Sequence, residues 1–352
     1  MSSPQALREL PAAQMMIQML TGKNLAQAIS VAAELGIADL LTDAPMVVEE
    51  LAAATSTHAP SLYRLLRALA SNGVFAESEG CRFALTPLAR PLRSDAPDSI
   101  RSLARLLGSP LLWRGWGELL HCVRTGETGV KQALGVTDPF SYFSEHPEQG
   151  RVFHECMADI SRLNTPAIVE AYDFGRFRKI VDVGGSHGML ISGILRRYPG
   201  PRGVVFDLPG IVEGAQRTIV AGGLTGRAES IAGNFFECVP PGADAYVLKQ
   251  VIHDWDDAAA LAILRNVRQA VPPEGRLLLI EFVIPPPDQP SLGKLLDLNM
   301  LVTTGGRERT QIEYRDLFAA AGFALTGVHP TAGPQCIVEG RCLPVDDVSR
   351  ES

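Results

Sequence analysis

Residues 179–188 have the sequence KIVDVGGSHG, an apolar run that ends in a glycine-rich turn. From this point the chain alternates short apolar runs with amphipathic helical stretches such as 189–198 and 257–270. The apolar runs are Ile180–Val183, Gly203–Phe206, Ala245–Leu248 and Arg276–Ile280. This alternation is typical of a parallel sheet with helices on both faces. The sequence therefore predicts an α/β fold with a doubly wound, Rossmann-like sheet.

The first hundred residues follow a different pattern. One short helix is expected over 48–54 and a second over 61–71, with a polar turn between them. Two short strands are expected after these helices, at 73–76 and 82–85. A helix-turn-helix followed by a hairpin indicates a winged-helix domain.

Length and pattern together predict two domains, because 352 residues is long for one compact unit. We expect a winged-helix domain over 1–105 and a second domain over 106–345. Within the second domain, residues 106–171 are expected to form a helical connector and pocket lid. Residues 346–352 are expected to be a disordered tail.

The composition argues against several classes of protein. A net charge of −7 argues against binding to nucleic acid or to an anionic membrane surface. No apolar run approaches the ~18 to 20 residues of a membrane span. Pro4, Arg8, Glu9 and Pro11 interrupt the stretch that a signal peptide would need, so a cytoplasmic protein is predicted. The six cysteines form no CxxC pair or zinc spacing, and no metal is expected.

The glycine-rich turn indicates a nucleotide-like ligand with a positive charge. Gly184 and Gly188 allow the backbone to turn tightly and to approach a ligand. A dinucleotide fingerprint would have glycine or alanine where Met189 stands, and Asp182 would repel a pyrophosphate. A carboxylate at this place suits S-adenosylmethionine, which has both an ammonium and a sulfonium group. The alternative is a strand-to-helix turn with no ligand.

Two further strand ends have polar side chains suited to this chemistry. Asp207 ends the second run and could accept the ribose hydroxyls, or it could cap a helix near residue 209. His253 follows the third run, and a neutral imidazole with a pKa of about 6.5 can act as a base at neutral pH. A purely structural histidine is the alternative.

Two carboxylates are placed to assist His253. Glu281 ends the fourth run on the same sheet edge, and Glu308 lies in the segment GGRERT. Either one could hold the imidazole in the tautomer that presents its free nitrogen to a substrate. The alternative for Glu308 is a surface ion pair with Arg307 or Arg309.

Six markers stand in order along the chain: VDVGGSHG, FDLPGIV, GNFF, LKQVIHDWDD, LLLIEF and GGRERT. With them the chain, from about residue 20 to about residue 343, resembles the winged-helix S-adenosylmethionine-dependent O-methyltransferases. This group includes plant caffeic acid O-methyltransferase and bacterial antibiotic-tailoring enzymes. The resemblance implies a class I methyltransferase sheet and an N-terminal domain that forms a homodimer and closes the partner's pocket. It also implies a hydroxylated aromatic or polyketide-like secondary metabolite as acceptor.

The resemblance also assigns roles to individual residues. It implies His253 as general base, with Glu281 and Glu308 flanking it. The residues implied to bind S-adenosylmethionine are Asp182, Gly184, Gly188, Asp207, Leu208, Asn234, Phe235 and Lys249. The residues implied to face the acceptor are Met157, Asp254 and Met300.

Two departures from the family pattern and three rival functions stay open. Ser186 stands where the family has glycine, and Asn234 stands where it has aspartate, although the Asn234 carbonyl oxygen can still bond to an adenine amino group. One rival is a relative that binds the same cofactor but acts as a decarboxylase, hydroxylase or cyclase. A winged-helix regulator is disfavoured because its recognition helix would have only Arg64 and Arg67 as cations. A nicotinamide dehydrogenase is disfavoured by the glycine spacing.

Overall fold

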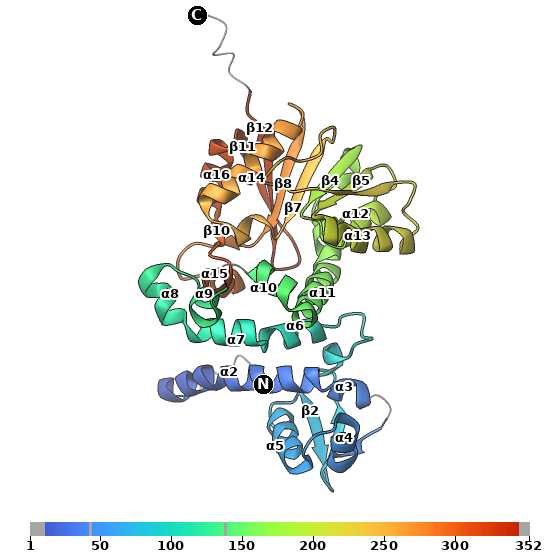
Figure 1. Cartoon of the computed structure of the whole chain (residues 1–352), viewed down its shortest axis with the longest axis vertical. Helices are drawn as coiled ribbons and strands as arrows, with labels where there is room; N and C mark the ends of the chain where they lie inside the picture. The colour runs from blue at the N-terminus through green and yellow to red at the C-terminus, as the bar shows by residue number, and fades with distance from the viewer. Residues whose placement is uncertain (1–10, 42–43, 137–138, 345–352) are drawn as a thin grey trace, which may run out of the picture. The chain divides into compact units, whose positions relative to one another are not determined.

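The computed structural model describes residues 11–41, 44–136 and 139–344 (Figure 1). It divides into two compact units. Unit 1 comprises Met1–Arg114 and Phe140–Ile160, and unit 2 comprises Gly115–Pro139 and Ser161–Ser352. The boundary expected between residues 105 and 106 falls inside helix α6 (Arg101–Leu107). The tail at 346–352, expected to be disordered, lies outside the described residues.

Unit 1 has the expected helix pair followed by a hairpin. Its three-stranded antiparallel sheet has the order β1-β3-β2. The strand expected at 73–76 begins two residues later, because Gly73 has a φ of +75° and still belongs to the turn. The elements of this part are α2 (Ala12–Glu34), α3 (Ile37–Leu40), β1 (Met46–Val47), α4 (Val48–Thr55), α5 (Ala59–Ala70), β2 (Phe75–Ser78), β3 (Arg82–Leu85), η1 (Arg90–Leu92) and α6.

The segment expected to be helical up to residue 171 consists of several short helices and one long one. Glycines in the left-handed region follow α8 and α9 and end these helices. The helices are α7 (Pro110–Gly117), α8 (Leu119–Thr125), α9 (Gly129–Leu134), α10 (Pro139–Glu145) and α11 (Pro147–Ala171). Helices α7, α10 and α11 each have residues in both units.

Unit 2 is built on a seven-stranded sheet of order β11-β12-β8-β7-β4-β5-β6. The four predicted runs form the parallel strands β8, β7, β4 and β5, as expected, and β6 joins them as a fifth parallel strand that was not predicted. Strands β11 and β12 are antiparallel. The strands are β4 (Lys179–Val183), β5 (Arg202–Asp207), β6 (Ala228–Ala232), β7 (Ala245–Lys249), β8 (Arg276–Glu281), β11 (Phe323–Pro330) and β12 (Cys336–Cys342). A separate parallel pair joins β9 (Val283–Ile284) to β10 (Arg309–Thr310).

Helices cover both faces of this sheet and enclose two cores. One core lies against α14 (Asp257–Ala270) and α16 (Gln311–Ala320). The other lies against the end of α11 and against α12 (Met189–Arg197) and α13 (Pro209–Ala221). The remaining elements are η2 (Phe174–Arg176), η3 (Ile252–Asp254) and α15 (Leu292–Thr303). No helix among the described residues has the length and apolarity needed to cross a membrane.

The strand order locates the expected binding edge. Strand β4 pairs with β5 on one side and with β7 on the other, so the direction of strand progression reverses at β4. Ligands of doubly wound sheets bind at the carboxyl ends of the strands at such a reversal. The glycine-rich turn after β4, Asp207 at the end of β5 and Lys249 at the end of β7 therefore lie where a ligand is expected.

A cluster of charges ties the outer strands of unit 2 to η2. The buried carboxylate of Glu339 on β12 accepts a bond of 2.8 Å from Arg176 and one of 3.0 Å from Nε2 of His329. Arg276 lies 3.4 Å from the same carboxylate. Burial alone would raise the pKa of Glu339, but the bonds from His329 and Arg176 outweigh burial and lower it.

Replacing Glu339 with Gln is expected to lower the free energy of unfolding at pH 7 by about 1.5–3 kcal/mol, the usual effect of losing hydrogen bonds to a charged group. Because the folded pKa is lowered, this stabilisation is present above the ordinary value of 4.5 and is lost as the pH falls through the folded pKa. Urea unfolding at pH 7 and at lower pH measures the difference, which should shrink in acid. Glu170→Gln, at an exposed pair with Arg197, is the control and should have little effect. An equal loss in both variants would contradict this account.

Candidate active site

The turn after β4 is shaped by three residues with positive φ. Gly184 and Gly188 have φ of +70° and +71°, and Ser186 between them has φ of +49°. A side chain at residue 184 would place its Cβ 2.8 Å from Cγ2 of Val251, so only glycine fits. Ser186 adopts the left-handed conformation in which glycine has no steric cost, which explains why glycine is usual there. The departure at Ser186 therefore keeps the shape of the turn.

Asp182 lies beneath this turn with one oxygen unpaired. A Cβ at Gly185 would lie 2.8 Å from its Oδ2, so the carboxylate is in close contact with the turn. Oδ2 is buried and accepts no hydrogen bond from the described residues. Burial raises the pKa of Asp182 to about 7, with Lys249 opposing this shift and Asp207 adding to it. A cationic donor that reached Oδ2 would satisfy this oxygen and stabilise its charge.

Lys249, at the end of β7, faces the same place. Its Nζ donates to Oγ of Ser161 at 2.9 Å and to Oε1 of Gln250 at 3.3 Å. Burial lowers the pKa of Lys249 to about 8, although Asp182 and Glu281 oppose this. Ser161 belongs to α11 and is a site residue that the sequence reasoning missed, since it lies 88 positions before Lys249.

Asp207 ties the end of β5 to the glycine-rich turn. Its Oδ2 accepts the N–H of Ser186 at 2.8 Å, and its Oδ1 accepts the N–H of Leu208 at 2.7 Å. Leu208, not Asp207, is the N-cap residue of α13, and no side chain of a described residue caps the first N–H groups of this helix. The alternative that Asp207 caps the helix is therefore wrong. The carboxylate holds the turn in shape and lies at the ligand edge.

Asn234 and Phe235 lie in a turn after β6. Oδ1 of Asn234 accepts the N–H of Phe236 at 3.0 Å, so this oxygen already has one partner and keeps one lone pair. Phe235 packs edge-on against Trp255 at 6.2 Å between ring centroids, and Asn266 bonds to its carbonyl oxygen. Cε1 of Phe235 would lie 3.7 Å from a Cβ at Gly184, which brings this ring to the glycine-rich turn.

His253, in η3, is surrounded by three carboxylates. Its Nδ1 lies 2.8 Å from Oε1 of Glu308 and 3.9 Å from Oε2 of Glu281, and its Nε2 lies 3.8 Å from Oδ1 of Asp254. Glu308 is buried, so the alternative of a surface ion pair with Arg307 or Arg309 is wrong. Of the two candidates, Glu308 is the one that bonds directly to the imidazole. A donating Nδ1–H leaves the lone pair of Nε2 available for a proton.

Three sets of backbone and side-chain interactions bring these groups together. Oε1 of Glu281 accepts the N–H groups of Val251 at 3.1 Å and Ile252 at 2.9 Å, which fixes the start of η3. The pairing of β9 with β10 places Glu308 beside the end of β8. Buried Arg309 then bonds to the carbonyl oxygens of Ile252 and Trp255 and to Asp257. These bonds therefore fix the backbone before and after His253, and with it the position of the imidazole.

The carboxylates change the proton affinity of His253 from the value that the sequence suggested. Burial alone would lower its pKa, but Glu281, Asp254 and Glu308 outweigh burial and raise it to about 10. Burial raises the pKa of Glu281 to about 7 and that of Asp254 to about 6, with His253 opposing both shifts. The reference pKa of about 6.5 therefore does not apply to this imidazole while all three carboxylates are ionised.

The expected acceptor-facing residues are divided between the two units. Met300 is buried on α15 in unit 2, and Asp254 follows His253 in the same unit. Met157 lies on the part of α11 that belongs to unit 1. Asp254, Met300 and the histidine cluster therefore belong to unit 2, and Met157 belongs to unit 1.

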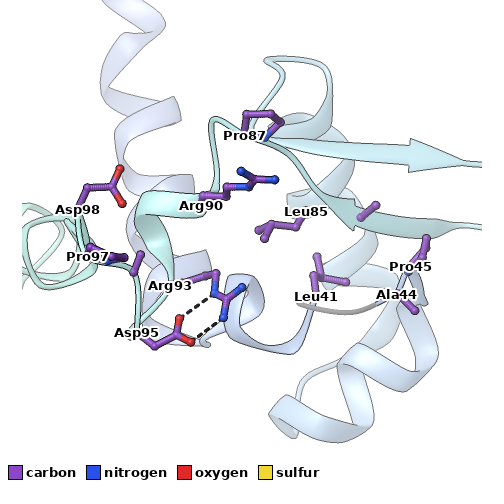
Figure 2. Close-up of a pocket in the computed structure, with 12 residues that line it drawn as sticks. Leu41, Ala44, Pro45, Leu85, Pro87, Arg90, Arg93, Asp95, Pro97 and Asp98 are labelled. Atoms are coloured by element: carbon purple, nitrogen blue, oxygen red, sulfur yellow. Dashed lines mark hydrogen bonds and ion pairs between the residues drawn. The ribbon is translucent and has the colours of Figure 1, made fainter.

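A hollow of about 820 Å³ in unit 1 contains none of the expected site residues (Figure 2). Arg93 pairs with Asp95 on its wall, as Figure 2 shows, and Arg90 is an exposed side chain. Its lining consists of Leu41, Ala44, Pro45, Ala84, Leu85, Pro87, Arg90, Arg93, Asp95, Ala96, Pro97 and Asp98.

The cluster around His253 also has the composition of a metal site. Ligand atoms of His253, Glu281 and Glu308 lie within 4.8 Å of one another, and all three residues are buried. Nδ1 of His253 is already bonded to Glu308, so a metal ion at this nitrogen would have to replace that hydrogen bond.

Comparison with known protein families matches both parts of the chain. Residues 116–324 match the O-methyltransferase domain, and residues 17–95 match the O-methyltransferase dimerisation domain.

Individual relatives extend over nearly the whole chain. The chain is 46% identical to the phenazine O-methyltransferase PhzM of Lysobacter antibioticus over 332 residues, which cover 94% of this chain and 97% of the relative. It is 36% identical to the 8-amino-8-demethylriboflavin N,N-dimethyltransferase of Streptomyces davaonensis, over 95% of this chain and 96% of the relative. The solved structure of the mitomycin 7-O-methyltransferase MmcR superposes with a TM-score of 0.88 at 37% identity, over 94% of this chain and 98% of that one.

Proposed function

The chain belongs to the family of S-adenosylmethionine-dependent methyltransferases that join an O-methyltransferase domain to an O-methyltransferase dimerisation domain, and from this premise we propose the reaction and the residues that perform it. The reaction is methylation of a hydroxyl group on a small aromatic or polyketide-like secondary metabolite, with His253 as general base. The observation that best supports it is the bond of 2.8 Å from Nδ1 of His253 to Glu308, which leaves Nε2 free to accept a proton.

The residues at the ends of β4, β5 and β7 fit S-adenosylmethionine. The unpaired Oδ2 of Asp182 suits the ammonium group, and Lys249, close enough to interact electrostatically with Asp182, provides a positive charge for an adjoining group of the cofactor. Asp207 suits the ribose, with Leu208 beside it. Asn234 and Phe235 suit the adenine, and Gly184 and Gly188 allow close approach of the backbone. When bound, S-adenosylmethionine supplies an electrophilic methyl group.

The protein's own part in the reaction is to position the acceptor and to remove its proton. Nε2 of His253 accepts the proton of the acceptor hydroxyl, and Glu308 stabilises the imidazolium that forms. Asp254 lies 3.8 Å from Nε2, where its carboxylate can hold a polar group of the acceptor. Met300 supplies an apolar contact. A general base beside the acceptor favours oxygen acceptors, whose proton must be removed as the new bond forms.

A screen of phenolic, amino-aromatic and polyketide-like acceptors, read by mass for the gain of one methyl group, tests this function. Methylation at oxygen with equal formation of S-adenosylhomocysteine supports it. Methylation at nitrogen, the activity named for the riboflavin relative, would overturn the choice of oxygen. Product formation without S-adenosylhomocysteine would favour a decarboxylase, hydroxylase or cyclase. Salt-sensitive specific DNA binding in a gel shift would favour a regulator.

The N-terminal helix supports a homodimer as the working form. Met16, Ile17, Met19 and Leu20 on α2 are large apolar side chains, and each is more than half exposed. Burial of such side chains by a second copy would remove this apolar surface from water. The match to the O-methyltransferase dimerisation domain from residue 17 supports the same assignment.

We expect the reaction to need no metal ion, because Glu308 engages Nδ1 of His253 and the proposed base needs the lone pair of Nε2 for the acceptor's proton. Dialysis against a chelator should therefore leave turnover unchanged, and added Mg²⁺ or Zn²⁺ should not raise it. Metal analysis of the purified protein before and after dialysis is the control. A loss of turnover that only one metal restores would show that the cluster around His253 is a metal centre.

His253→Ala is expected to keep affinity for S-adenosylmethionine and to lower turnover by roughly 10²–10⁴, the usual contribution of a positioned base. Calorimetry measures the affinity, and methyl transfer to the best acceptor measures the turnover. His58→Ala, at an exposed histidine of unit 1, is the matched control. Near-normal turnover in the His253 variant would remove this residue from the role of base.

Asp207→Ala is expected to weaken binding of S-adenosylmethionine, because it removes the acceptor for the ribose and releases the N–H of Ser186. The loss of hydrogen bonds to a charged group should raise the Kd by roughly 10- to 100-fold. Titration calorimetry measures the Kd, and Asp207→Asn, which retains one acceptor oxygen, should have a smaller effect. Asp316→Ala, at an exposed carboxylate of α16, is the control. An unchanged Kd would place the ribose elsewhere.

A further inference from the structure

Two buried oxygens beside His253 have no hydrogen-bond partner among the described residues. Glu281 uses Oε1 for the N–H groups of Val251 and Ile252, and its Oε2 is left unpaired. Glu308 uses Oε1 for His253, and its Oε2 is likewise unpaired. A buried carboxylate that is charged and has an unpaired oxygen destabilises the fold. A proton on one of these two carboxylates would remove part of this cost.

The charges that face His253 do not balance if every carboxylate is ionised. Glu281, Glu308 and Asp254 would carry three negative charges against one imidazolium. Arg309 directs its guanidinium to Asp257 and to backbone carbonyl oxygens, and Lys249 directs its ammonium group to Ser161 and Gln250. Burial and the charges of Glu281 and Glu308 raise the pKa of Tyr314 well above its ordinary value, so its phenol is neutral and adds no charge. Like charges gathered in a buried site favour the uptake of a proton by one of them.

Glu281 is the carboxylate best placed to hold that proton. Glu308 lies 2.8 Å from Nδ1, where a negative charge is most favourable, whereas Oε2 of Glu281 lies 3.9 Å away. Glu281 is fully buried, whereas the side chain of Asp254 is 21% exposed and can be partly solvated. We propose that Glu281 keeps a proton on Oε2 at neutral pH, and that this proton leaves His253 uncharged and able to act as the base.

The proposal rests on the proposed function and resolves a conflict within it. An imidazole that faced ionised carboxylates on all sides would already be protonated at neutral pH and could not accept the acceptor's proton. The negative charge of Glu281 raises the pKa of His253, so a proton on Glu281 makes the imidazole less basic. The acceptor's proton then moves to Nε2 while its oxygen gains the methyl group. The imidazolium that forms faces the negative charge of Glu308, and the proton leaves to solvent afterwards. Glu281 thus acts through His253 as a positioning residue.

Nitrogen NMR of the full-length protein with ¹⁵N-labelled histidine tests the proposal without any acceptor. The signal lost in His253→Ala identifies His253 among the seven histidines. In the wild type we expect a neutral ring with the proton on Nδ1 at pH 7. In Glu281→Gln the pKa of His253 should stay within about half a unit of the wild-type value, because a protonated, neutral carboxyl group is replaced by a neutral amide. A wild-type ring that is charged at pH 7, and whose pKa falls by more than about one unit in Glu281→Gln, would overturn the proposal.

Activity measurements with matched variants supply the second readout. Glu281→Gln keeps a carbonyl oxygen for Val251 and Ile252 and should lower kcat by a smaller factor than Glu308→Gln does. Glu308→Gln removes the charge that stabilises the imidazolium and should lower kcat by roughly 10²-fold, with a changed pH profile. Equal losses in the two variants would contradict the proposal. Glu281→Ala, which leaves two buried N–H groups unpaired, measures the purely structural contribution.

Failure of the proposed function and failure of this inference are distinguishable. If no acceptor is methylated, the function fails, but the NMR titration still decides whether Glu281 holds a proton. If methyl transfer proceeds and Glu281→Gln shifts the titration of His253, the function stands and the inference fails.

Discussion

The hydrogen bond between Nδ1 of His253 and Oε1 of Glu308 is the interaction on which the rest of the site depends. It fixes the ring orientation and the tautomer, and therefore which nitrogen can accept a proton. The pairing of β10 with β9 and the bonds of Arg309 to the carbonyl oxygens of Ile252 and Trp255 support this bond. A segment that follows β8 along the chain is thus folded back to support a residue that precedes it.

At the carboxyl ends of the parallel strands, where a ligand is expected, two charged side chains join separate elements. Asp207 joins the end of β5 to the turn after β4 through the N–H of Ser186. Lys249 joins the end of β7 to α11 through Ser161. Both charged groups lie next to Asp182, so three strand ends and one helix share a single electrostatic environment. The unpaired oxygen of Asp182 is the point in this environment that most favours a cation.

The parallel strands and their carboxyl-end residues could be predicted because alternation of apolar runs and helices is a local signal. Asp182, Asp207 and His253 were found in this way. The edge strand β6, with the sequence AESIA, was missed because its polar residues give it no apolar run. The choice of Glu308 over Glu281 as direct partner of His253 needed the pairing of β9 with β10, which joins residues 26 positions apart. The bond of Ser161 to Lys249 joins residues far apart in the sequence, and the pKa of His253 depends on burial and on distant carboxylates. No local sequence pattern contains that information.

The turn that Asp207 holds in place has a consequence for turnover in a cell. Its shape is set by bonds within the protein, so a nucleoside ligand meets a rigid surface and little ordering entropy is lost on binding. In the proposed mode of binding, the groups of this turn contact parts that S-adenosylmethionine shares with S-adenosylhomocysteine. The demethylated product should therefore compete strongly with fresh donor. The rate in the cell would then follow the ratio of the two nucleosides, and would depend on whichever hydrolase removes the used one.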